Sequence, residues 1–302
     1  MRYAVHAYAW TSSWSDDDLP IVDRAAALGL DAVEIPLMEL GAVHPEAIRA
    51  RADAAGVELV TSTVLTEATD PTSETPAVRD AAYAELRGCV DAAAAMGATV
   101  LGGVIYAAHG RLPQDRPGPV HRERAADVLR AAARHAAPLG VRLGIEPVNR
   151  YETFLVNTAR QALELAELVG EDNVGVHLDA YHMNIEEEEF WAPVRLVADR
   201  LVHFHLSESH RGTPGTGTVD WQAIMDALDD AGYDGYVGLE SFAEVSPAMR
   251  SATCIWRDLA PDSDTLVRDG LAFLRGLSRR RPAGSPPAPP GRAGAPSRSS
   301  RA

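Results

Sequence analysis

The sequence predicts a closed (β/α)8 barrel, the TIM-barrel architecture of the α/β class, built as a single domain from residues 1–277. Two observations predict it: a recurring phrase, in which an Ala- and Leu-rich helical stretch ends at a glycine and leads into a β-rich run, and a total of eight such runs. Alternating helices and apolar strands form parallel sheets covered by helices. Eight units in 302 residues, 46% of them hydrophobic, favour a closed barrel over a doubly wound sheet.

Glycine marks most of the predicted junctions between helix and strand. It stands at positions 29, 56, 97, 140, 170 and 232, after helical sequence and before a β-rich run. A glycine just past a helix end adopts left-handed geometry without Cβ strain, so it terminates the helix. The first strand starts the chain, and the seventh lacks the glycine. In order, the predicted strands are residues 3–8, 30–34, 57–60, 98–100, 142–146, 174–179, 202–206 and 236–240.

The last four predicted strands each carry a polar group at or near the end that should not be buried unpaired. These groups are separated by 33, 26 and 35 residues, the spacing of successive strand-plus-helix units. Because barrel enzymes place their chemistry at the C-terminal ends of strands, the four side chains are expected to converge. Three carboxylates and an imidazole suit Mn²⁺ best, with Co²⁺ or Mg²⁺ as alternatives. The predicted metal ligands are Glu146, Asp179, His205 and Glu240.

Strand alternation indicates that these groups point into the barrel. A glycine lies two residues before each glutamate, on the same face, and leaves room inside. His203 shares its face with His205, but His205 is nearer the C-terminal end of the strand. We therefore interpret His203 as a packed, hydrogen-bonded residue one layer below the site. His177 receives the same interpretation.

The charge of the chain argues against nucleic acid as a partner. The 28 basic and 43 acidic residues give −15, but six arginines lie in residues 278–302, which contain no acidic residue. Without them, 22 basic residues remain against 43 acidic ones, a net charge of −21 for the folded part. Such a body repels a phosphate backbone. The 278–302 segment, rich in Pro, Gly and Arg, is expected to be a disordered tail.

The remaining bulk features indicate a cytoplasmic protein. Cys89 and Cys254 are far apart and lack metal-type spacing, so they are expected to be reduced thiols. The N-terminus is too polar for a signal peptide. No apolar stretch reaches the ~20 residues that a membrane span needs, so no membrane partner is expected.

Several joined motifs make a family resemblance specific. They read Gly-Ile-Glu-Pro-Val-Asn-Arg-Tyr-Glu at 144–152, Leu-Asp-Ala-Tyr-His-Met-Asn-Ile-Glu-Glu at 178–187 and His-Phe-His-Leu-Ser-Glu-Ser-His-Arg at 203–211. Further matches are Pro-Gly-Thr-Gly at 214–217, Leu-Glu-Ser-Phe at 239–242 and Ala-Thr-Cys-Ile-Trp-Arg-Asp at 252–258. With these motifs the chain closely resembles the D-tagatose 3-epimerase / D-psicose (allulose) 3-epimerase family, which are xylose-isomerase-like barrel enzymes.

The resemblance implies a metal-dependent ketose 3-epimerase acting on a small sugar, with the same four ligands. By the same match Glu152, His182 and Arg211 hold substrate hydroxyls near C1 to C3, and His6 takes the place of the family's first-strand aromatic residue. We also expect a homodimer or homotetramer. The loop after the fourth strand, residues 106–109, is one in which members of the family differ widely, and its position at the distal sugar end leaves the identity of the ketose open.

Two further features bear on the substrate. Trp14 follows the first strand and is expected to line the substrate pocket, as large apolar side chains do in most small-molecule sites. Gly215 and Gly217 are able to cradle a phosphate, yet only Arg211 accompanies them, so an unphosphorylated ketose is favoured.

The chemistry that the ligands suggest is proton transfer beside a carbonyl. Glu146 and Glu240, on strands that are not neighbours, are the expected catalytic pair: one removes the C3 proton and the other returns it to the opposite face. Rival hypotheses remain open. They are an aldose–ketose or hydroxypyruvate isomerase, an inosose dehydratase, an apurinic endonuclease-like DNA-repair protein, which the acidity disfavours, and a sugar-binding protein without catalysis.

Overall fold

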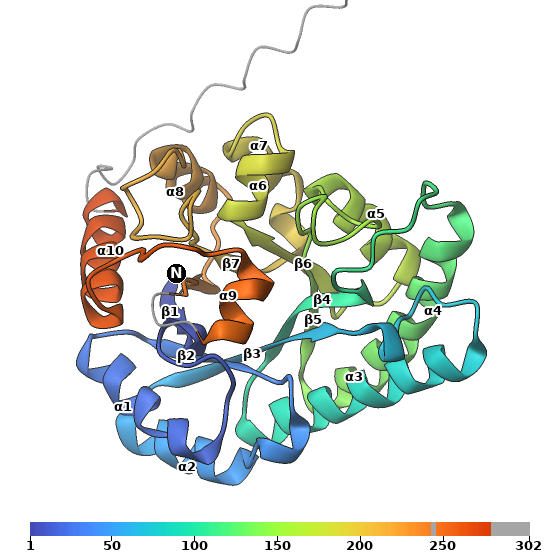
Figure 1. Cartoon of the computed structure of the whole chain (residues 1–302), viewed down its shortest axis with the longest axis horizontal. Helices are drawn as coiled ribbons and strands as arrows, with labels where there is room; N and C mark the ends of the chain where they lie inside the picture. The colour runs from blue at the N-terminus through green and yellow to red at the C-terminus, as the bar shows by residue number, and fades with distance from the viewer. Residues whose placement is uncertain (243–245, 279–302) are drawn as a thin grey trace, which may run out of the picture.

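The computed structural model describes residues 1–242 and 246–278, and within them eight parallel strands close into a barrel in sequence order (Figure 1). The last strand pairs with the first, so the predicted TIM barrel is confirmed. No helix in this part of the chain is long and apolar enough to cross a bilayer. The strands are β1 (Arg2–His6), β2 (Ala32–Pro36), β3 (Glu58–Leu65), β4 (Val100–Ala108), β5 (Arg142–Ile145), β6 (Val174–Asp179), β7 (Leu201–His205) and β8 (Tyr236–Leu239).

Helices surround the barrel (Figure 1), and two short ones, α6 and α9, precede the outer helices that follow β6 and β8. Residues of α9 line the cavity at the C-terminal end of the strands. The α-helices are α1 (Pro20–Ala27), α2 (Pro45–Ala55), α3 (Pro76–Met96), α4 (Pro119–Ala136), α5 (Ala159–Val169), α6 (Ala180–Glu186), α7 (Trp191–Leu196), α8 (Trp221–Asp230), α9 (Pro247–Thr253) and α10 (Ser263–Ser278).

The glycines predicted at helix ends have the left-handed backbone that the prediction requires. Their φ angles lie between 63° and 82° at positions 29, 56, 97, 140, 170 and 232. Proline stands in the first turn of α1, α2, α3, α4 and α9, where its missing N–H costs no hydrogen bond. Local sequence thus sets most element boundaries.

Strands β3 and β4 extend several residues beyond the predicted ends. Gly102 lies inside β4 for a packing reason. A Cβ at Gly102 would lie 2.6 Å from Nδ1 of His177, whose ring fills the barrel interior at that level. A Cβ at Gly144 would likewise lie 3.1 Å from the Cβ of His177. These glycines make room for side chains from other strands.

The predicted tail lies almost wholly outside the described residues. Helix α10 ends at Ser278, the first residue of the predicted tail segment. The boundary of a single domain at residue 277 therefore stays a prediction.

Candidate metal centre and active site

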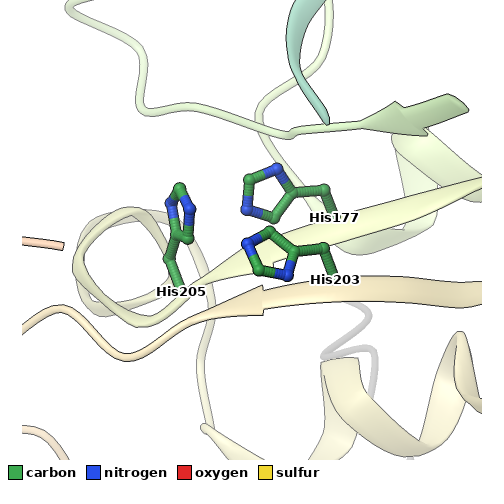
Figure 2. A group of neighbouring side chains, drawn as sticks. All are labelled: His177, His203 and His205. Carbon is green, nitrogen blue, oxygen red and sulfur yellow. The ribbon is translucent and has the colours of Figure 1, made fainter. Parts of the chain in front are cut away.

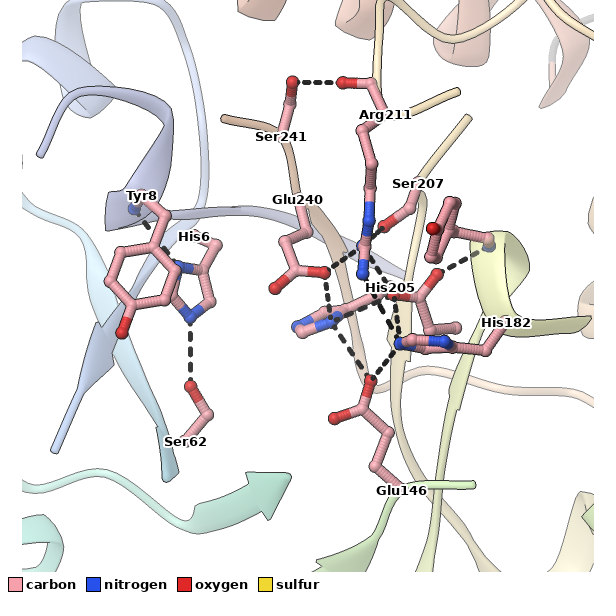
Figure 3. Close-up of polar contacts among 12 residues, drawn as sticks. His6, Tyr8, Ser62, Glu146, His182, His205, Ser207, Arg211, Glu240 and Ser241 are labelled. Carbon is pink, nitrogen blue, oxygen red and sulfur yellow. Dashed lines mark hydrogen bonds and ion pairs between the residues drawn. The ribbon is translucent and has the colours of Figure 1, made fainter. Parts of the chain in front are cut away.

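The four residues predicted as ligands meet at one end of the barrel; Figure 3 shows three of them, Glu146, His205 and Glu240. Asp179 and His205 are the last residues of β6 and β7, and the two glutamates directly follow β5 and β8. The imidazole of His205 is their common neighbour. Its Nδ1 lies 3.5 Å from a carboxylate oxygen of Glu240 and 3.9 Å from oxygens of Glu146 and Asp179.

This group of atoms requires positive charge. Nδ1 of His205 is buried without a hydrogen-bond partner, while Nε2 of the same ring lies 2.9 Å from Oε2 of Glu34. A carboxylate only accepts, so the Nε2 proton is committed to Glu34 and Nδ1 is the nitrogen that faces the other carboxylates. Burial lowers the pKa of His205, but Glu34 and Glu240 outweigh it and raise the pKa well above its usual value. Either a proton or a metal cation satisfies Nδ1, and metal binding displaces such a proton.

The donor set fits a divalent metal ion. Glu146, Asp179 and His205 each offer one ligand atom, and these atoms lie within 4.8 Å of one another. Oxygen donors with one nitrogen and no thiolate suit a hard or borderline ion such as Mn²⁺. The fourth predicted ligand, Glu240, is not in this group, although its carboxylate lies 3.5 Å from Nδ1 of His205. The role of all four as ligands stays a prediction.

Arg211 places a fixed guanidinium beside these carboxylates. Its Nη1 lies 2.9 Å from Oδ2 of Asp179 and forms a close ion pair with Glu240. Its φ of 62° is in the left-handed region, which costs energy in a non-glycine residue. Two contacts hold Arg211 in place. The hydroxyl of Ser241 donates to the carbonyl oxygen of Arg211, and the ring of Tyr181 lies 4.0 Å from the Cζ atom of Arg211. Burial lowers its pKa, but the carboxylates raise it more.

The residues around Glu146 and Glu240 shift the pKa values of the two carboxyl groups in opposite directions. Burial raises the pKa of Glu146 well above its usual value, and the negative charges of Glu240 and Asp179 reinforce this. Burial also raises the pKa of Glu240, but Arg211 and His205 outweigh it and hold the pKa well below its usual value. Environments that push two carboxylate pKa values apart are typical of an acid and a base acting together.

Glu152 and His182 both line the cavity and are joined through Asn149. The amide of Asn149 donates to Glu152 (2.7 Å), and its backbone N–H donates to Nδ1 of His182 (3.1 Å). Burial lowers the pKa of His182, and because Nδ1 accepts from the backbone of Asn149, the neutral ring carries its proton on Nε2. Nε2 lies 3.4 Å from Nη2 of Arg211 and 3.9 Å from oxygens of Glu146 and Asp179. Nε2 is therefore a donor toward the metal centre.

Glu152 is ionised. Burial raises its pKa, but the hydrogen bond from His109 (3.1 Å), together with His182, Arg211 and Asn149, lowers it to about 2. His109 directly follows β4. A carboxylate and an imidazole therefore stand together in the cavity wall.

A cavity of about 220 Å³ opens over the predicted centre. Five of the predicted residues line it, and most of the others in its wall are apolar or aromatic. The lining residues are Tyr8, Met38, Val64, Val104, His109, Glu146, Val148, Glu152, Tyr181, His182, Arg211, Glu240, Phe242, Met249, Ala252 and Thr253.

His6 and Trp14 were predicted in the substrate pocket, and neither is among the residues that line it. His6 is buried one layer lower, where Nε2 bonds Ser62 and Nδ1 accepts from the backbone N–H of Tyr8. Tyr8, in the 3₁₀ helix Ala7–Ala9 that directly follows β1, is an aromatic side chain that does line the wall. Trp14 is 4% exposed and packs in the core, because the chain after β1 turns outward through a short 3₁₀ helix toward α1.

His177 and His203 lie beside the ring of His205 (Figure 2), and they form the layer beneath the centre. The rings of His177, His203 and His205 lie edge to face or tilted, with centroids 4.1 to 4.9 Å apart. His203 is hydrogen bonded as expected, with Nε2 2.7 Å from Glu34 and Nδ1 3.2 Å from the carbonyl oxygen of Tyr236. His177 is packed and fully buried as expected, but the expected hydrogen bond is wrong among the described residues: neither ring nitrogen has a hydrogen-bond partner, and Nδ1 lies 3.7 Å from Oε2 of Glu146.

Glu34 is the functional candidate that sequence reasoning missed. It is fully buried on β2 and contacts two histidines of β7 across the barrel. Burial raises its pKa, but His205, His203 and His6 outweigh it and keep the pKa well below its usual value. The signal was present, since residues 32–34 also form an apolar run that ends on a carboxylate.

The glycine-rich loop after β7 surrounds the carboxylate of Glu208. The buried Glu208 accepts from the backbone N–H groups of Ser209, Gly215 and Val219 and from Nε1 of Trp221. The N–H of Gly215, which would otherwise be available to a phosphate, is thus already bonded to a carboxylate. This arrangement supports the expectation of an unphosphorylated substrate.

Gly217→Ala should destabilise the protein by about 1–3 kcal/mol, because an added Cβ would lie 2.3 Å from Oε1 of Glu208. Thermal unfolding measures the effect. The matched control is Gly276→Ala in α10, where an added Cβ meets nothing within 4 Å and alanine is the better helix former. Equal melting temperatures for the two variants would contradict the packing argument.

The chain matches the family model described as "Xylose isomerase-like TIM barrel" over residues 22–277. It is 38% identical over 278 residues to a ketose 3-epimerase of Arthrobacter globiformis, covering 91% of this chain and 96% of that protein. It is 36% identical to an L-ribulose 3-epimerase of Methylomonas sp., with 91% and 97% covered. The crystal structure of a Methylomonas D-allulose 3-epimerase in complex with D-allulose superposes with a TM-score of 0.88 at 34% identity, covering 92% and 97% of the two chains.

Proposed function

The chain belongs to the xylose isomerase-like TIM barrel family, and from its site we propose that it is a metal-dependent ketose 3-epimerase. One observation carries the proposal. Glu146 and Glu240 come from β-strands that are not neighbours and reach toward His205 from opposite sides in Figure 3. Both line the same cavity. Inversion at carbon needs a proton acceptor on one face and a proton donor on the other, and this pair supplies both.

The proposed metal ligands are Glu146, Asp179, His205 and Glu240. When bound, the ion supplies Lewis acidity that polarises the C2 carbonyl and acidifies the C3 hydrogen. We favour Mn²⁺, with Co²⁺ or Mg²⁺ as alternatives, because the donors are oxygens and one imidazole nitrogen.

The protein's side chains then move the proton. One of the two glutamates removes it from C3 to give an enediolate, and the other returns a proton to the opposite face. His182 donates from Nε2 to a substrate oxygen, which its hydrogen bond from the backbone of Asn149 prepares it to do. Arg211 and Glu152 orient the hydroxyls near C1 to C3, so that the C3 hydrogen is held within reach of the bases.

The proposed substrate is a free ketose of the D-tagatose, D-fructose/D-psicose or L-ribulose type. The names of the relatives and the occupied N–H of Gly215 support this choice. We further propose a cytoplasmic homodimer or homotetramer. The free cysteines support a reducing compartment. Trp256 and Tyr151, each 70% exposed, support burial against another copy.

The products decide between this function and its nearest rival. We expect the protein with Mn²⁺ to convert one or more free ketoses into their C3 epimers and to form no aldose, as measured by chromatography of a ketohexose and ketopentose panel. Aldose formation without the C3 epimer would support an aldose–ketose isomerase, which uses the same four ligands.

A further inference from the structure

We propose that Glu34 is a positioning residue of the metal centre, holding the imidazole of His205 by Nε2 so that Nδ1 faces the cation. The inference rests on the proposed metal-dependent function. Glu34 is fully buried and is not among the residues that line the cavity, so it reaches the chemistry only through another residue. Its Oε2 lies 2.9 Å from Nε2 of His205.

The bond fixes which nitrogen the ring offers. An imidazole is able to present either nitrogen, and a half-turn about its Cβ–Cγ bond puts carbon atoms where Nδ1 and Nε2 stood. With the Nε2 proton held by Glu34, only Nδ1 is directed at the three carboxylates, 3.5 to 3.9 Å away. Histidine ligands usually donate their second N–H to a carboxylate or carbonyl, and loss of that partner typically weakens metal binding about 10–100-fold.

Two other roles would use the same contacts, and each makes a different prediction. Glu34 also lies 2.7 Å from Nε2 of His203. In the first alternative, Glu34 stabilises the fold through His203 and has no effect on metal binding. Alternatively, the nitrogens of His177, His203 and His205 lie within 4.8 Å of one another and would bind a second ion. In that case the second ion would displace the proton from Nε2 of His205 into solvent, and Nε2 would no longer donate to Glu34.

The experiment compares Glu34→Gln with His203→Gln as the matched control. The first substitution removes both the charge and one acceptor oxygen, whereas the second leaves the contact between Glu34 and His205 in place. Isothermal titration of the metal-stripped proteins with MnCl₂ gives affinity and stoichiometry. We expect one Mn²⁺ per wild-type chain, about 10–100-fold weaker binding in E34Q, and wild-type affinity in H203Q even if its melting temperature falls. Saturating Mn²⁺ should restore kcat in E34Q, because Glu34 does not touch the substrate.

The outcomes separate the hypotheses. Equal Mn²⁺ affinity in E34Q and wild type, with a lower melting temperature, would mean a structural role and overturn the inference. A wild-type protein that binds two ions per chain and loses one in H203Q would overturn it in favour of the three-histidine site. A wild-type protein that binds no metal would instead refute the proposed function.

A measurement on the unaltered protein covers the case in which E34Q does not fold. With ¹⁵N-labelled histidine and Mg²⁺ as a diamagnetic ion, long-range ¹H–¹⁵N spectra report which nitrogen of each ring carries the proton. We expect His205 to be protonated at Nε2 and not at Nδ1. A proton on Nδ1 of His205 in the loaded protein would contradict the inference.

Discussion

Exhaustive EDTA treatment should reduce the epimerase activity to background, and Mn²⁺ or Co²⁺ should restore it. Three carboxylates surround Nδ1 of His205, and the guanidinium of Arg211 is already paired with two of them, Asp179 and Glu240. Without the ion, the site lacks the Lewis acid that would polarise the C2 carbonyl. Removing a main electrostatic stabiliser of the developing oxyanion typically costs at least about 10²–10³ in kcat. The measurement is initial rate against free metal concentration in the stripped protein.

Two controls make the EDTA result interpretable. Metal analysis must show that the stripped protein is empty, and its circular dichroism spectrum must show that the barrel remains folded. Mg²⁺ is expected to restore less activity than Mn²⁺, since an imidazole ligand suits the softer ion better. Full activity in folded, metal-free protein would contradict the proposed site.

Glu146→Gln and Glu240→Gln should each lower kcat by about 10²–10⁴-fold, because each removes the proton-transfer group on one face of C3. Each variant also loses a charged ligand, so metal affinity must be measured and the assay run at saturating Mn²⁺. Under those conditions one variant is expected to exchange the C3 hydrogen of one epimer without converting it, since the other base still serves its own face.

The matched control for these variants is Glu58→Gln. Glu58 begins β3 at the opposite end of the barrel, where it is exposed and pairs with Arg2 at 2.9 Å. An exposed ion pair of this kind contributes little, so its loss should leave kcat unchanged. Substantial epimerisation by E146Q or E240Q at saturating metal would contradict the two-carboxylate mechanism even if the ion binds as proposed.

Much of the fold was predictable because its determinants are local. Left-handed glycines end the helices at positions such as Gly56 and Gly97, and each apolar run that follows is a buried strand. The convergence of the predicted ligands followed from one rule: in a closed parallel barrel, strand ends lie on one rim. Residues at the ends of β5 to β8 therefore had to become neighbours.

The parts that the sequence did not predict depend on depth inside the barrel. Glu34 ends an apolar run just as Glu146 does, but it lies one layer below the rim, in contact with His203 and His205. The relative shift of neighbouring strands sets this depth, and a single sequence does not encode it locally. The same reason explains why His6 lies beneath the wall and Tyr8 lies in it.

The most direct test of the central claim is the position at which solvent hydrogen enters the sugar. The Mn²⁺-loaded protein is incubated in D₂O with free ketoses, and deuterium is located by NMR in substrate and product. If Glu146 and Glu240 transfer the proton at C3, deuterium should appear at C3 of the ketose and of its accumulating epimer, with none at C1. Deuterium at C1 together with aldose formation would contradict the account and assign the site to an aldose–ketose isomerase.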